Sequence, residues 1–132
     1  MSIDSIGDFL TIIRNGVMIT KPSVVAPYSK MRFAIAKILK EQGFIRDIIV
    51  EEDPKTARRV LKVLLKYVEG ESVIHELNRV SKPSRRHYLG VNNIKPVIGG
   101  LGISILTTDR GVIDHKQADK LGVGGEIICT VW

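Results

Sequence analysis

Two adjacent threonines, Thr107 and Thr108, are the side chains of this sequence best suited to contact a polar ligand. They follow an apolar run, Ile103 to Leu106, that is typical of a core strand, and they precede a tight turn, Asp109-Arg110-Gly111. A hydroxyl both donates and accepts hydrogen bonds, and its short reach keeps the backbone close to the ligand. Such groups suit the shallow minor groove of an RNA duplex, which displays 2′-hydroxyls. The residues alone fit ordinary strand-end threonines equally well.

A paired glycine, Gly124-Gly125, opens the final strand of the sequence. Glycine at such a place is by default a turn residue. It also allows the main chain to approach a ligand closely, because it has no Cβ atom. Both interpretations stay open from the residues alone.

Positive charge is concentrated between Leu77 and Thr108, a stretch that contains no acidic residue. Its five basic residues are Arg79, Lys82, Arg85, Arg86 and Lys95. Tyr88 stands beside two of them, and aromatic rings and guanidinium groups both stack on nucleotides. The whole chain has 20 Lys and Arg against 14 Asp and Glu, a net charge of +6, which favours a polyanionic partner. A solvated basic face is the alternative.

The sequence predicts no enzyme, no metal site and no cofactor. The three histidines are scattered without metal-ligand spacing, and neither a nucleophile elbow nor a phosphate-binding loop motif is present. Gly99-Gly100-Leu101-Gly102 precedes a strand rather than a helix, so we interpret it as a bend. Cys129 lies in an apolar strand and is expected to be a buried structural thiol. With no signal peptide and no long apolar run, the expected location is the cytoplasm.

The elements that position these residues predict an α+β fold made of two small modules that pack together. Residues 1–70 form an N-terminal α/β module with the order α-β-α-β-β, and residues 71–132 form a mostly β module with one short helix. The seam is placed at Glu69-Gly70-Glu71-Ser72, which is polar and contains glycine. Three helices are expected: Asp4–Ile19, capped by Asp4 or Ser5; a helix from the N-cap Ser29 to Gly43; and a short helix from about Asp114 to Leu121. The expected strands are a short piece around Val24-Val25, then Phe44–Glu51, Arg58–Val68, Val73–Val80, His87–Val91, Ile103–Thr108 and Ile127–Val131.

Blocks of residues along nearly the whole chain resemble the bacterial small-subunit ribosomal protein S8 family. The blocks are Ile6–Thr11 with Ile13-Arg14-Asn15, Ser29-Lys30-Met31, Ile38–Ile45, Arg79–Pro83, Arg85-Arg86 with Tyr88, Gly102–Leu106, Gly111-Val112, and Gly124–Trp132. The resemblance implies two associated α/β modules without catalysis. It implies binding to a helical site in the central domain of small-subunit ribosomal RNA early in assembly, next to neighbouring ribosomal proteins. It also implies repression of the protein's own messenger RNA through a similar site.

The resemblance also points to the RNA-contacting residues. The family loop after the G-I-S-I-L strand is typically Ser-Thr-Ser, which corresponds here to Thr107, Thr108 and Asp109. Together with the residue pattern, it predicts that both threonines and the Gly124-Gly125 backbone read the groove, with Glu126 orienting the loop. Phosphate contact or base stacking is expected from Lys82, Arg85, Arg86 and Tyr88. Weaker candidates for backbone contacts in the first module are Arg14, Asn15, Ser29, Lys30 and Lys55.

Asp109 departs from the family loop, because a carboxylate near phosphates is repelled and is costly to desolvate without a partner. It can cap its own turn, pair with Arg110, or accept a hydrogen bond from a base amine or 2′-hydroxyl. We favour the turn role, since Asp at the first position with Gly soon after suits a tight turn. Among other classes of function, a basic protein-interaction module and a DNA-binding protein fit the composition less well, and an enzyme fits least.

Overall fold

The computed structural model describes residues 5–90 and 101–132. Contacts between backbone positions divide the chain into two compact units, one of which is Ser5–Ile74 and the other of which contains His75–Trp132. The first unit has the order helix, strand, helix, strand, strand, followed by a hairpin of two short strands, and the second is mostly β with one short helix. The predicted α+β class is therefore confirmed.

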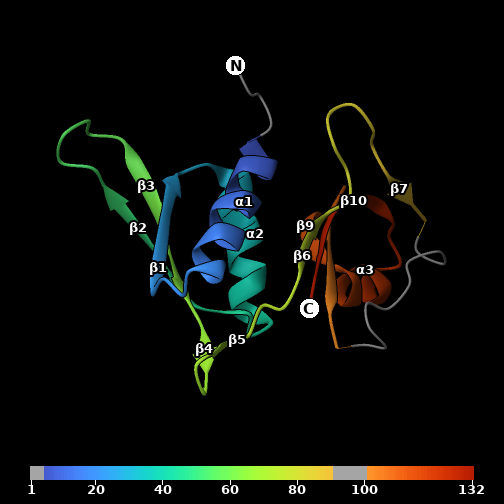
Figure 1. The fold of residues 1–132 in the computed structure, drawn as a ribbon. Helices are drawn as coiled ribbons and strands as arrows, with labels where there is room; N and C mark the ends of the chain where they lie inside the picture. The colour runs from blue at the N-terminus through green and yellow to red at the C-terminus, as the bar shows by residue number, and fades with distance from the viewer. Residues whose placement is uncertain (1–4, 91–100) are drawn as a thin grey trace. The chain divides into compact units, whose positions relative to one another are not determined.

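The main sheet of the first unit has three antiparallel strands in the order β1-β3-β2, formed by β1 (Ser23–Pro27), β2 (Ile45–Glu52) and β3 (Arg59–Leu65). Helices α1 (Ser5–Met18) and α2 (Lys30–Glu41) lie beside it (Figure 1). Alternation in β3 places Leu61, Val63 and Leu65 in the core. This sheet therefore buries one of its two faces.

Capping residues define the second helix of this unit. The Oγ of Ser29 accepts a hydrogen bond from the backbone N of Arg32 at 3.1 Å, so the predicted N-cap is confirmed. The buried Arg32 side chain donates to the carbonyl oxygens of Ser5 and Pro27 at 3.2 and 2.9 Å. It thus joins the starts of both helices to the end of β1. Asp4, one of the two predicted caps of α1, lies outside the described residues; Ser5 is the first residue of that helix.

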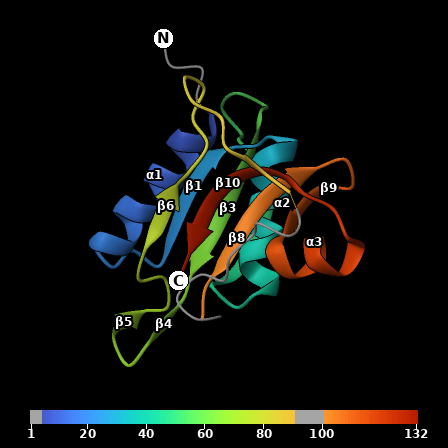
Figure 2. The same ribbon diagram turned by 90° about the vertical axis from the view of Figure 1, so that its right-hand side faces the viewer.

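The second unit is built around β10 (Gly125–Val131). The path of its sheet is β6-β10-β8-β9, with β6 (Leu77–Arg79), β8 (Ile103–Thr108) and β9 (Gly111–Asp114), while β7 (Tyr88–Leu89) pairs with the start of β10. Figure 2 shows β10 beside β8, and α3 (His115–Leu121) next to β8 and β9. Asp114 caps α3 by accepting from Gln117 N at 2.9 Å, and Gly122 ends the helix in the left-handed conformation.

Several predicted strands are shorter in the structure. Residues 73–80 contain only β6, because just three residues there pair with β10, and the described end of 87–91 contains only β7. The strand predicted over 58–68 ends at Leu65, and Tyr67–Val68 (β4) pairs instead with Glu71–Ser72 (β5) in a small hairpin. That hairpin contains the residues where the seam was placed. The strand β9 was not predicted, because its residues show no alternation and it is defined by pairing with β8.

Candidate nucleic-acid interface

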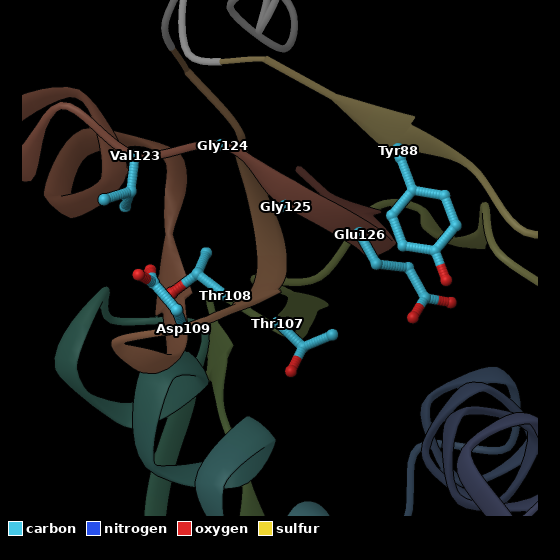
Figure 3. A pocket seen from close by; sticks show the side chains of 8 residues that line it. All are labelled: Tyr88, Thr107, Thr108, Asp109, Val123, Gly124, Gly125 and Glu126. Atoms are coloured by element: carbon cyan, nitrogen blue, oxygen red, sulfur yellow. The ribbon is translucent and has the colours of Figure 1, made fainter.

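Three functional candidates lie in one row across three strands. Glu126 of β10 is paired with Tyr88 of β7 on one side and with Thr107 of β8 on the other. Residues directly opposite each other in an antiparallel pair place their side chains on the same face. Figure 3 shows Tyr88 and Glu126 extending side by side from the sheet. Residues separated widely in the sequence are thus brought to one surface.

An open pocket of about 410 Å³ lies on this surface. Seven of the residues that line it are candidates from the sequence, and the eighth, Val123, was missed: the lining is Tyr88, Thr107, Thr108, Asp109, Val123, Gly124, Gly125 and Glu126 (Figure 3). Val123 follows Gly122, the C-cap of α3, and carries no chemical signal that sequence reasoning could use. The Tyr88 side chain is 67 % exposed, so its ring is available to a ligand.

The two glycines of the pocket are required by the packing of neighbouring backbones. A Cβ atom on Gly124 would lie 2.3 Å from Leu89 O, and one on Gly125 would lie 2.3 Å from Thr107 O. These separations are far below any normal contact. The interpretation of the pair as simple turn glycines is therefore wrong. They allow the start of β10 to approach β7 and β8 closely, and both glycines line the pocket.

The two threonine hydroxyls differ in what they already bind. The Oγ1 of Thr108 donates to Gly111 O and accepts from Arg110 N, both at 3.0 Å, so it closes the β8–β9 turn. Thr107 has no side-chain hydrogen bond to any described residue. Its hydroxyl can therefore donate and accept toward a ligand in the pocket, whereas Thr108 keeps only part of its acceptor capacity.

Asp109 does not have the turn role that we favoured. Thr108 occupies the first position of the turn, Asp109 and Arg110 are its two central residues, and Gly111 closes it with φ +100°. The side-chain hydrogen bonds of this turn come from Thr108. Within the described residues, the exposed Asp109 carboxylate forms no ion pair with Arg110 or with any other group. It stands at the edge of the pocket as an unpaired negative charge.

The basic candidates of this unit lie on a segment next to the pocket. Arg86 Nη1 lies 2.9 Å from Glu126 Oε2, and the Glu126 side chain is only 12 % exposed. Lys82 and Arg85 are exposed, and two backbone hydrogen bonds of 2.9 and 3.0 Å join them across a turn of two residues. Arg79 and Ser81 lie at the base of this segment, while Lys95 lies outside the described residues.

The candidates of the first unit are not part of this pocket, which is lined entirely by residues of the second unit. Arg14 and Asn15 are exposed on α1, Lys30 is exposed at the start of α2, and Lys55 is exposed in the β2–β3 turn. The hydroxyl of Ser29 serves as the N-cap of α2.

Other groups of chemical interest have structural surroundings. Cys129 is fully buried, and this burial raises the pKa of its thiol from 9.0 to about 12. The described part of the chain contains no cluster of His, Cys, Asp and Glu residues able to hold a metal ion. Among its helices, none has the length and apolar character needed to cross a membrane. The Gly99-Gly100 pair lies outside the described residues.

Comparison with known proteins gives a consistent result. The family model described as Ribosomal protein S8 matches residues 4–132. The chain belongs to the ribosomal protein S8 family. Relatives named small ribosomal subunit protein uS8 include one from Thermodesulfovibrio yellowstonii, 46 % identical over all of both chains. Those from Hahella chejuensis and Acidobacterium capsulatum are 46 % and 48 % identical, each covering 98 % of this chain and 97 % of the relative.

Membership in the S8 family confirms the resemblance seen in the residues. The protein is a structural component of the small ribosomal subunit and takes part in translation, in association with ribosomal RNA and other ribosomal proteins. S8 proteins are structural and not enzymes, and they belong to the cytoplasmic ribosome.

Proposed function

We propose that this protein binds a helical site in the central domain of small-subunit ribosomal RNA through the pocket between β7, β10 and β8, and that this binding helps the subunit to assemble. The observation that carries the proposal is the row Tyr88–Glu126–Thr107, which places an exposed ring and a free hydroxyl on one surface. An aromatic face can stack on an unpaired base, and a hydroxyl can contact a 2′-hydroxyl in a minor groove.

Charge near the pocket supports an RNA ligand. The exposed cations Lys82 and Arg85 lie in the same unit, and Arg86 is joined to Glu126 at the pocket wall. In this arrangement the cations supply attraction to the phosphate backbone, while the pocket supplies selectivity. In the first unit Arg14, Asn15, Lys30 and Lys55 are exposed, and we propose them for further contacts with the RNA backbone.

The proposal is tested by titrating the protein against the central-domain RNA fragment and against a scrambled duplex of equal length, at several salt concentrations. We expect clear preference for the true fragment, and we expect Thr107→Val to reduce that preference. Lys120→Gln, which removes an exposed cation on α3, shows how much RNA affinity depends on net charge alone, and it should not change the preference between the two RNAs. Equal binding to both duplexes, lost together as salt rises, would contradict the proposal.

Translational repression is the second part of the proposed function. It requires that the protein's own messenger RNA contain a helix that fits the same pocket. We expect a fragment of that messenger to compete with the ribosomal RNA fragment and to lose affinity with the same pocket variant. Failure of every messenger fragment to compete would contradict repression but not ribosomal RNA binding.

A further inference from the structure

The chain leaves the sheet between β6 and β7 as a short basic loop, residues 82–86, and both ends of this loop are attached to one residue of β10. At its start, Ser81 N donates to Ile127 O at 3.1 Å. At its end, His87 O accepts from Ile127 N at 2.9 Å. The loop therefore begins and ends on β10, one residue away from Glu126.

Ser81 closes the base of the loop. It is 2 % exposed, and its Oγ accepts from His87 N at 2.8 Å and donates to His87 O at 3.3 Å. Its carbonyl oxygen accepts from Nε of Arg79. A buried hydroxyl with both bonding directions used holds its partners in one geometry, because breaking either bond leaves a buried polar group without a partner. The segment above this base, Lys82 to Arg86, is exposed.

The loop holds two like charges directly opposite each other. Lys82 and Arg85 face each other across the Pro83-Ser84 turn, joined by both of their backbone hydrogen bonds. Side chains in this relationship leave the same face with Cβ atoms about 5 Å apart, and like charges there repel. Neither side chain has an ion pair or hydrogen bond with any described residue. The carboxylate at the pocket wall, Glu126, is bound to Arg86.

We infer that Lys82 and Arg85 together bind a single phosphate group of the RNA backbone, and that Ser81 is the positioning residue that holds them ready for it. The inference rests on the proposed function, since RNA supplies the phosphate. A guanidinium and an ammonium can contact different oxygens of one phosphate, and the anion removes the repulsion between them. The loop thus gains an interaction that only an anion can supply.

The test for a shared phosphate is a double-mutant cycle on the central-domain RNA fragment. Lys82→Gln and Arg85→Gln are each expected to lower affinity about tenfold, the effect of one charge-assisted hydrogen bond. If they share one phosphate, the double variant loses little more than either single variant, because the contacts are coupled. Two independent contacts would multiply to about a hundredfold loss and would overturn the inference. Lys116→Gln with Lys120→Gln on α3 is the control for net charge.

The role of Ser81 is tested in two backgrounds. In an otherwise wild-type protein, Ser81→Ala is expected to lower RNA affinity. It should also reduce by about one the slope of the logarithm of affinity against the logarithm of salt concentration (the salt slope). In the Lys82→Gln/Arg85→Gln background it should change neither quantity. An equal loss in both backgrounds would mean that Ser81 only supports the fold, and it would overturn the positioning role. Should Ser81→Ala not fold, Ser81→Thr keeps the hydroxyl, and retained affinity with an unchanged slope is expected.

Failure of this inference differs from failure of the proposed function. A wild-type protein that does not prefer the true fragment over the scrambled duplex contradicts the proposed function. A protein that shows this preference but gives additive losses for Lys82 and Arg85 contradicts only the shared phosphate.

Discussion

A Cβ atom on Gly125 would lie 2.3 Å from the carbonyl oxygen of Thr107. β10 and β8 therefore meet there at a distance that only glycine permits, and this contact fixes the backbone of the threonine whose hydroxyl is free. The position of the candidate binding group thus depends on the absence of a side chain on the neighbouring strand.

Gly125→Ala is expected to destabilise the protein by about 1–3 kcal/mol, the usual effect of inserting atoms into a packed site. Chemical denaturation measures it, with Lys116→Ala on the exposed face of α3 as the control. RNA affinity should also fall, because Thr107 must move. A free energy of unfolding within about 0.5 kcal/mol of wild type would show that β10 and β8 can move apart to accommodate the added methyl group at little cost, which would contradict the prediction.

The two threonines should respond differently to the same change. Thr108→Val removes both turn bonds and is expected to lower stability by about 1 kcal/mol per bond. Thr107→Val breaks no hydrogen bond within the described residues, so stability should be kept while RNA affinity falls. Denaturation and RNA titration of both variants separate these effects. If the two variants lost the same RNA affinity and had the same stability, the proposed difference between the two hydroxyls would be contradicted.

Asp109→Ser should leave RNA affinity unchanged or raise it, because it removes an unpaired carboxylate from the edge of the proposed RNA site. The expected gain decreases as salt rises, since charges at the surface are screened. Asp119→Ser, on the exposed face of α3, is the matched control. A clear loss of affinity for Asp109→Ser would show that the carboxylate contacts a donor on the RNA.

Cys129 predicts a stability change at high pH. Burial raises its pKa from 9.0 to about 12, so the folded protein favours the neutral thiol. The stability that the protein gains from burying the neutral thiol is fully present below pH 9, the pKa of the unfolded chain, and is lost as the pH rises toward 12. The stability difference between wild type and Cys129→Ala should therefore shrink over this window. A thiol reagent should modify the native protein only through unfolding, and rapid labelling at pH 8 would contradict the burial.

His115 predicts a change on the acidic side. Its Nδ1 accepts from Ser104 N at 3.2 Å, and burial lowers its pKa below 6.5, with Lys116 lowering it further and Asp114 and Asp119 opposing. Folding therefore favours the neutral ring. The stability that this ring contributes is fully present above pH 6.5 and is lost as the pH falls through the lowered pKa. Unfolding curves between pH 7.5 and 5 should show this loss, and His115→Asn should reduce it. The same slope in both proteins would contradict a role for the ring.

Local signals were sufficient for much of the fold. The strand Ile103–Thr108 and the cap Ser29 were predicted correctly, because each depends on side chains near in sequence. The lengths of β6 and β7 were wrong, since the partner strand decides how many residues pair. β9 was missed for the same reason.

The candidate site needed pairing information that a single sequence lacks. Sequence reasoning named Tyr88, Glu126 and Thr107, but their common row follows from the register of three strands. The difference between Thr107 and Thr108 follows from the exact turn positions, which placed Thr108 rather than Asp109 first. Ser81 lies in one of the blocks that resemble the family, but its role was not predicted, because that role depends on hydrogen bonds to a residue six positions later.

β10 is the strand to which β6, β7 and β8 all bind, and it follows all three in the chain. During synthesis, the strands of the first unit emerge together with their partners, and domains fold in the order in which they emerge. Among the described strands, β6 and β7 pair only with β10, so both remain unpaired until β10 has been synthesised. The proposed RNA pocket, which is lined by residues of β7, β8 and β10, can therefore form only after the last strand of the chain has been synthesised.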